Sequence, residues 1–164
     1  MCEPVVKSGS SRTLVSPVTL RFTDLDEVVD RVHALFVEWE DDSTFVPPLD
    51  LPSLHQMKLA VHEWLSNLIQ HANFESRRPV VTMEFEANGE YVRCGIEDNS
   101  QGFDLDGRLS ARSEILESFP ERGMGLLMIK ACTKDMRYER GRGDVNRLEF
   151  LVSSEQDPWL NIPF

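Results

Sequence analysis

A run of twenty residues without proline or glycine, residues 54–73, constrains the fold of this chain more than any other segment. Its length and composition predict a buried helix of about five turns. Glu63, Asn67 and His71 follow one another at intervals of four, so they share one stripe of that helix. Apolar residues flank the stripe, and burying a carboxylate, an amide and an imidazole among them is costly without a task.

An ATP site is one task that fits these residue types. Glu63 would act as the general base, and the amide oxygen of Asn67 would complete an octahedral Mg²⁺ shell made otherwise of phosphate and water oxygens. The spacing alone does not decide this, because most glutamate and asparagine pairs four residues apart lie on solvated helix faces. The order of two later segments favours the nucleotide interpretation.

Both later segments combine glycine with a change of secondary structure. Residues 94–104 read CGIEDNSQGFD and predict a strand that runs into a turn after Asp98. Residues 122–130 read RGMGLLMIK and predict a glycine loop that opens a helix. A carboxylate at a strand end can accept a charge-assisted hydrogen bond from one amino group, and N–H groups at a helix N-terminus can hold phosphate.

In their order and spacing, these three segments resemble the asparagine box and the two glycine boxes of the GHKL (Bergerat-fold) ATPases. That superfamily includes DNA gyrase, a class of heat-shock chaperones, histidine kinases and mismatch-repair ATPases. Within it, the chain is most similar to the small stand-alone anti-sigma-factor serine kinases of bacterial partner-switching systems. The resemblance extends from around Pro17 to around Ser153.

The resemblance implies a role for each matching residue. Asp98 would accept a hydrogen bond from the adenine amino group, Glu63 would be the catalytic base, and Asn67 would be the metal ligand. Residues 103–120 would form the ATP lid. The remaining nucleotide contacts that it implies are His71, Gly102, Arg122, Gly123, Gly125, Leu126 and Asn146. For His71, capping of the helix end is an alternative to phosphate contact.

Ser100 departs from the family pattern, since it stands where the first glycine of that box belongs. Serine tolerates a positive φ poorly, so we expect either a different turn or a strained one. The departure weakens the prediction of an adenine pocket and leaves Gly102 as the retained glycine of this box.

The resemblance implies an ATP- and Mg²⁺-dependent serine/threonine protein kinase that phosphorylates a STAS-domain anti-anti-sigma protein, with a sigma factor competing for the same surface. One alternative is a non-catalytic module that keeps the fold and holds a partner, which Ser100 favours. Another is the catalytic domain of a histidine kinase, which would transfer phosphate to a histidine. Homodimers are common in the resembled family.

Charge and cysteine content exclude several other classes. The chain carries 17 basic and 28 acidic residues, a net charge of −11, which disfavours nucleic acid and anionic membranes as partners. Cys2, Cys94 and Cys132 have no zinc-ligand spacing and indicate reduced thiols, the last two in the core. With no apolar run of spanning length and no signal peptide, the prediction is a cytoplasmic protein.

The patterning predicts a flexible leader over residues 1–16 and a single domain over 17–164. Strands are expected at 18–22, 80–86, 91–97, 136–140 and 147–152, with helices at 25–40, 54–73 and 124–134. Asp24 or Asp26 would cap the first helix and Ser53 the second. Together these elements predict an α+β two-layer sandwich, with helices on one face of a mixed, mostly antiparallel sheet.

Overall fold

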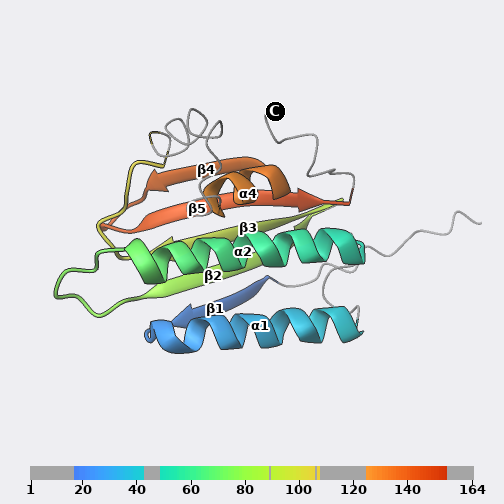
Figure 1. Cartoon of the computed structure of the whole chain (residues 1–164), viewed down its shortest axis with the longest axis horizontal. Helices are drawn as coiled ribbons and strands as arrows, with labels where there is room; N and C mark the ends of the chain where they lie inside the picture. Colours follow the sequence, from blue (N-terminus) through green and yellow to red (C-terminus); the bar gives the residue numbers. More distant parts are fainter. Residues whose placement is uncertain (1–16, 43–48, 89, 106, 108–124, 155–164) are drawn as a thin grey trace, which may run out of the picture.

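A computed structural model describes residues 17–42, 49–88, 90–105, 107 and 125–154. Its strands are β1 (Val18–Phe22), β2 (Val81–Asn88), β3 (Tyr91–Asp98), β4 (Lys134–Arg140) and β5 (Asn146–Ser153). Its helices are α1 (Leu25–Asp42), α2 (Leu51–His71) and α4 (Gly125–Cys132). The sheet has the order β1-β2-β3-β5-β4, and Figure 1 shows the helices lying along one side of it.

This arrangement confirms the α+β sandwich with helices on one face. The expectation of a mixed sheet was wrong, because every pairing between the described strands is antiparallel. The physical reason is that β4 and β5 form a hairpin, and β5 then inserts beside β3 with β4 at the edge.

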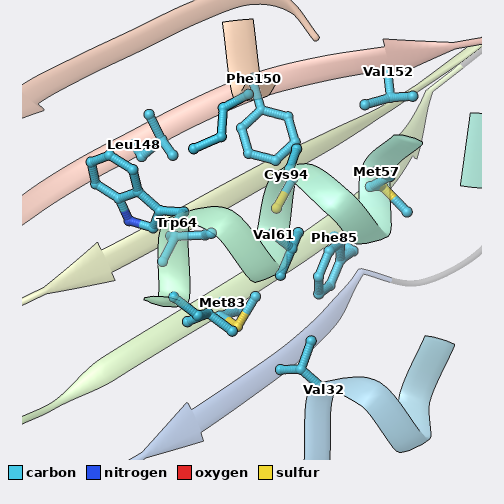
Figure 2. Close-up of a cluster of buried hydrophobic side chains, with 14 of the residues drawn as sticks. Val32, Met57, Val61, Trp64, Met83, Phe85, Cys94, Leu148, Phe150 and Val152 are labelled. Carbon is cyan, nitrogen blue, oxygen red and sulfur yellow. The ribbon is translucent and has the colours of Figure 1, made fainter. Parts of the chain in front are cut away.

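The core lies between the sheet and the helices. Side chains of β5 alternate between buried and half-buried, so one face of the strand meets the helices, as period-2 patterning requires. Figure 2 shows Trp64 of α2 beside Leu148 and Phe150 of β5, with Phe85 of β2 further along the same layer. Each large apolar side chain buried here contributes roughly 1.5–3 kcal/mol relative to exposure. Cys94 and Cys132 are buried free thiols, which confirms their predicted place in the core.

Helix α2 begins three residues earlier than its pattern suggested. Asp50 is the N-cap, and its Oδ1 accepts a hydrogen bond from Ser53 N at 2.9 Å, so the prediction of Ser53 as cap was wrong. Pro52 lies in the first turn of α2, which tolerates proline because the N–H at that position would be unpaired anyway. At α1, Asp26 N donates to Asp24 Oδ1, which selects Asp24 of the two expected caps.

Helix α4 ends at Cys132, so the expectation that it reaches Lys134 was also wrong. The buried hydroxyl of Thr133 donates to Ile129 O at 2.8 Å, and Asp135 adopts a left-handed φ of 50°. Thr133 is the one residue between α4 and β4, and the positive φ of Asp135 lies inside β4, where the pairing with β5 shifts register between Lys134 and Arg137.

The face of the sheet away from the helices carries charged side chains. The Arg147 guanidinium donates to Glu97 Oε1 at 2.9 Å and to Glu149 Oε2 at 3.1 Å, and it lies flat across Gly95. A Cβ at Gly95 would come within 2.5 Å of Arg147 Nη2. The glycine therefore leaves room for this ion-pair network.

Helices α1 and α2 meet along a seam that holds two histidines. The rings of His33 and His62 contact edge to face, with 6.1 Å between their centroids. Burial lowers the pKa of His62, and the neighbouring Lys58 and His33 lower it further. None of the described helices is long and apolar enough to cross a membrane, and no group of three or more potential metal ligands gathers within the described residues.

Candidate functional site

Asp98 and Asn146 meet at one end of the sheet, although 48 residues separate them in the sequence. Asp98 is the last residue of β3, and its register partner Asn146 is the first residue of β5. Both side chains are almost fully buried, at 1% and 2% exposure. The antiparallel pairing of β3 with β5 therefore places the predicted base-reading carboxylate beside a second residue predicted to contact the nucleotide.

The two oxygens of the Asp98 carboxylate differ in their partners. Oδ1 accepts hydrogen bonds from Ser100 N at 2.9 Å, from Ser100 Oγ at 2.5 Å and from Asn146 Nδ2 at 3.2 Å. Oδ2 is buried, and no group in the described part of the chain donates to it. A buried carboxylate oxygen without a donor is costly, so this atom is available to accept a hydrogen bond from a ligand.

Ser100 fits its turn without the backbone strain that was one of its two expected outcomes. Among the described residues, positive φ outside glycine occurs at Glu75, Asp135 and Asp144, not at Ser100. The bond from Ser100 N to Asp98 Oδ1 closes a side-chain turn of the kind that aspartate favours. The turn therefore differs from one that requires glycine at this position.

Gly102 does require glycine. Its φ is +74°, and a Cβ there would lie 2.5 Å from Asn146 Oδ1 and 3.1 Å from the Tyr138 hydroxyl. Both the backbone conformation and the lack of space exclude a larger residue. The glycine that the sequence retains in this box is thus the one that the geometry needs.

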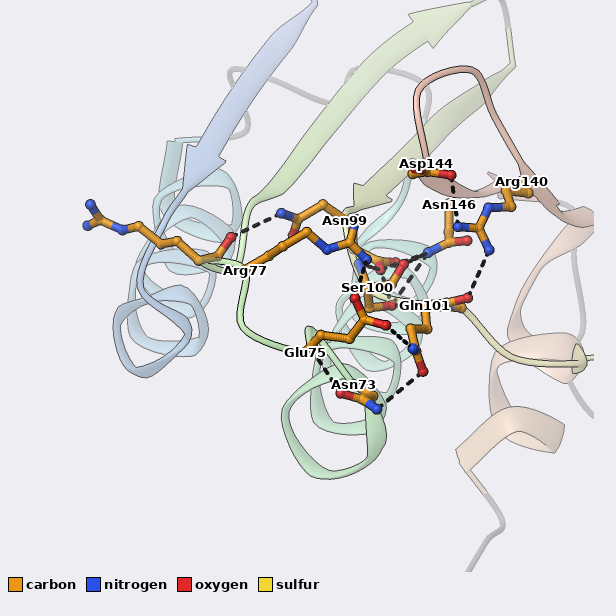
Figure 3. A network of polar contacts seen from close by, with 12 residues as sticks. Asn73, Glu75, Arg77, Asn99, Ser100, Gln101, Arg140, Asp144 and Asn146 are labelled. Atoms are coloured by element: carbon orange, nitrogen blue, oxygen red, sulfur yellow. Dashed lines mark hydrogen bonds and ion pairs between the residues drawn. The ribbon is translucent and has the colours of Figure 1, made fainter.

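The loop after β3 is tied to the end of α2, as Figure 3 shows. Gln101 N donates to Asn73 O at 2.9 Å, and Asn73 Nδ2 donates to Gln101 Oε1 at 3.2 Å. Gln101 Nε2 also donates to Glu75 Oε1. On the other side, Arg140 of β4 donates to Gln101 O at 3.2 Å. These contacts hold the loop between the helix layer and the sheet edge.

Glu63 and Asn67 lie half-buried on α2, where that helix packs against α4. Both face Gly125, the first residue of α4. A Cβ at Gly125 would lie 2.5 Å from Glu63 Oε2 and 3.8 Å from Asn67 Nδ2. Asn67 Nδ2 is buried without a hydrogen-bond partner among the residues that the structure describes. The predicted base and the predicted metal ligand thus converge on the start of α4, at the later glycine of the second glycine box.

An aromatic cluster connects the two ends of the site. Trp64 follows Glu63 in α2 and packs against Phe103 and Tyr138, with 5.3 Å between ring centroids in each case. Phe103 and Tyr138 stack on each other at 5.1 Å. An open pocket of about 340 Å³ lies here, lined by residues 101–105, residues 138–140 and Asn146. Trp64 is fully buried and belongs to the hydrophobic core.

The other predicted contacts have different fates. His71 is exposed in the last turn of α2, and the C-cap position is Ala72, whose N–H donates to Leu68 O. Leu126 is buried in α4 at 2% exposure, among the core residues. Arg122 and Gly123 lie outside the described residues, as does most of the predicted lid.

Sequence reasoning missed the hydroxyl of Ser100 as a partner of Asp98. The spacing of an aspartate and a serine two residues apart, which favours side-chain turns, was the available signal. It also missed Phe103 and Tyr138 as neighbours of Trp64. These three aromatic residues come from separate segments, so no local pattern connects them.

Comparison with known proteins supplies the family. The description "histidine kinase-like ATPase domain" belongs to a family model that matches residues 22–150, and the chain is a member of that family. The chain is also similar to the serine-protein kinase RsbW of Oceanobacillus iheyensis. The two are 23% identical over 110 residues, which cover 63% of this chain and 69% of that protein.

Proposed function

We propose that the protein is a serine/threonine protein kinase of the anti-sigma-factor type, which binds ATP with Mg²⁺ and phosphorylates a STAS-domain anti-anti-sigma protein. The observation that carries the nucleotide part is the buried, unpaired Oδ2 of Asp98 at the end of β3. Membership of the ATPase family and the similarity to a serine-protein kinase support the rest.

The described residues fit a nucleotide with its metal ion. Asp98 Oδ2 accepts from an amino group of the base, and Gly102 lets the side chains of Asn146 and Tyr138 approach the loop beside it. At the other end, Asn67 offers an amide oxygen, a ligand that suits Mg²⁺. When bound, Mg²⁺ neutralises phosphate charge and orients the phosphates. Gly125, Gly123, Arg122 and His71 are assigned to the phosphates, and Leu126 and Asn146 to the base.

Glu63 is the proposed general base, because its carboxylate faces the start of α4, where the phosphates would lie. Its Oε2 takes the proton of the partner's serine hydroxyl as the serine oxygen bonds to the γ-phosphorus. The bond from that phosphorus to the β,γ-bridging oxygen breaks, and ADP leaves with the electron pair. The chain's contribution is mostly positioning and charge stabilisation, as in phosphoryl transfer generally.

The partner logic of the anti-sigma kinases completes the proposal. A sigma factor competes with the STAS-domain protein, and phosphorylation of the latter decides which of the two is bound. Such a pathway operates in the cytoplasm, and the kinase acts as a homodimer. The net charge of −11 gives no reason to add nucleic acid as a partner. The assignment of residues 17–164 to the kinase domain stays a prediction, and residues 1–16 lie outside the described part of the chain.

A non-catalytic module that holds its partner without phosphorylating it is the second candidate. Ser100 and the packed aromatic cluster favour it, since both place side chains beside Asp98 or the loop that follows it. The convergence of Glu63 and Asn67 on Gly125 argues for the kinase, because a binding module has no use for a base and a metal ligand at that point.

The test mixes the full chain with γ-labelled ATP, Mg²⁺ and a STAS-domain protein encoded beside it. We expect acid-stable label on a serine or threonine of the partner, and a loss of at least about a hundredfold in rate for Glu63→Gln. Glu84→Gln is the matched control, because Glu84 is a half-buried glutamate of β2 paired across the sheet with Gly95.

Three results would count against the proposal. ATP binding without any transfer by the wild type favours the holding module. Acid-labile label on a histidine favours a histidine kinase domain. Equal rates for the wild type and Glu63→Gln show that Glu63 is not the base.

A further inference from the structure

We propose that Ser100 is a positioning residue for base selection. Its hydroxyl fixes the Asp98 carboxylate so that Oδ2 alone is open, and the site therefore prefers a purine with a 6-amino group over one with a 6-oxo group. This inference rests on the proposed nucleotide binding. Ser100 is the position where this chain departs from the glycine pattern of the first glycine box.

Hydrogen-bond geometry settles the direction of the Ser100 proton. Ser100 Oγ accepts from Gly102 N at 3.1 Å and lies 3.4 Å from Asn146 Nδ2. Both neighbours are N–H groups and can only donate. The orientation of the Asn146 amide is itself fixed, because Nδ2 donates to the carbonyl oxygen of Ser100 at 2.8 Å. The hydroxyl proton is therefore left to Asp98 Oδ1.

This network saturates one side of the carboxylate and leaves the other side empty. Oδ1 accepts hydrogen bonds from three donors, and the shortest of these bonds comes from the Ser100 hydroxyl, with 2.5 Å between the oxygens. Oδ2 has no donor among the described residues. Turning the carboxylate would break three hydrogen bonds in a site where Asp98 and Ser100 are each 1% exposed. The open acceptor is thus held in one direction.

A fixed acceptor discriminates between the two purine types. A 6-amino group donates to Oδ2 and satisfies it. A 6-oxo group presents a second acceptor, so that two unpaired oxygens would face each other in a buried site. Sites that are built to hydrogen-bond a substrate group reject analogues that lack it far better than apolar pockets reject a change of size. Without the hydroxyl, Asp98 keeps only two donors and can turn to reduce the mismatch.

The experiment measures dissociation constants for ATP and inosine triphosphate, each with Mg²⁺, by titration calorimetry on the full chain. Wild type is compared with Ser100→Ala, Ser100→Gly and Ser100→Thr. We expect the wild type to prefer ATP by at least about a hundredfold. Ser100→Ala and Ser100→Gly should weaken ATP binding about tenfold and inosine triphosphate binding by less than about threefold. Ser100→Thr retains a hydroxyl and should keep the preference.

A merely structural role of Ser100 would weaken both ligands equally, so the ratio of the two constants is the decisive readout. Ser153→Ala is the control, because Ser153 is a buried serine at the opposite end of β5. An unchanged ratio in Ser100→Ala and Ser100→Gly overturns the inference and leaves nucleotide binding intact. A wild type that binds neither ligand overturns the proposed function as well. If the alanine variant does not fold, the glycine and threonine variants decide between these outcomes.

Discussion

A Gly125→Ala substitution adds one methyl group at the first residue of α4, where it faces the proposed base. The added Cβ would lie 2.5 Å from Glu63 Oε2, whereas ordinary contact begins at 3.4 Å. The carboxylate must therefore move by about 0.9 Å, the difference between these two distances. Glu63 presents the end of a flexible side chain, so it can make this movement without unfolding the domain.

The effects on stability and on catalysis should have opposite signs. Alanine in place of glycine stabilises a helix interior by roughly 0.5–1 kcal/mol and the first residue by less, so the melting temperature should stay the same or rise slightly. A displacement of about 1 Å in a catalytic group costs roughly a hundredfold in rate, which equals about 2.7 kcal/mol of transition-state stabilisation. The variant is thus expected to be a stable and slow enzyme.

The assay is single-turnover phosphoryl transfer to the STAS-domain partner at saturating ATP and Mg²⁺, accompanied by thermal melting. Gly95→Ala is a closely matched control, because its Cβ would lie at the same 2.5 Å from a charged group, Arg147 Nη2, on the other face of the sheet. We expect Gly95→Ala to transfer at the wild-type rate. A folded Gly125→Ala variant that transfers within about twofold of wild type would refute the assigned position of the base.

Three further substitutions test the fold and the base end of the site. Asp50→Ala should lower the free energy of unfolding in urea by about 1 kcal/mol through loss of the N-cap. Hydrogen bonds from Ser53 lower the pKa of Asp50, so the stability difference between wild type and Asp50→Ala should be complete above the ordinary aspartate pKa. It should vanish as the pH falls through the lowered pKa of the folded protein. A difference that stays constant with pH would refute this account. Burial lowers the pKa of His62, so the native state resists protonation of this side chain. Wild type should therefore lose more stability than His62→Gln between pH 7 and pH 5. Equal changes of melting temperature with pH in the two proteins would contradict this. Gly102→Ala forces a methyl group against Asn146 at positive φ and should destabilise the domain by about 1–2 kcal/mol and abolish ATP binding in calorimetry, while retained affinity would place the base elsewhere.

Local signals in the sequence were sufficient for most of the fold. The proline- and glycine-free run around Glu63 predicted α2, and alternation predicted the strands to within two residues at each end. The errors occurred at helix ends, where the residue type alone does not decide whether the helix continues. Pro52 breaks a helix interior but fits a first turn, and the buried hydrogen bond from the Thr133 hydroxyl to Ile129 O at the end of α4 cannot be read from composition.

The assembly of the site was harder to predict, because it depends on strand order. Asp98 and Asn146 become neighbours only because β5 returns beside β3 while β4 takes the edge. This strand order depends on contacts between segments far apart in the sequence, and no short pattern predicts it. The role of the Ser100 hydroxyl was hidden for a related reason, since its meaning depends on which oxygen of Asp98 the Asn146 amide already occupies.

The position of Trp64 makes this tryptophan an intrinsic fluorescence probe of the candidate site. The indole is fully buried, adjoins Glu63 along the chain and touches Phe103 in the loop that follows Asp98. We therefore expect its emission to respond to changes in that loop, in addition to the emission of Trp39, which is buried against Phe36 and Phe85, and of Trp159. Loading of the site should then be detectable by intrinsic fluorescence in real time, without attaching a dye or labelling the nucleotide.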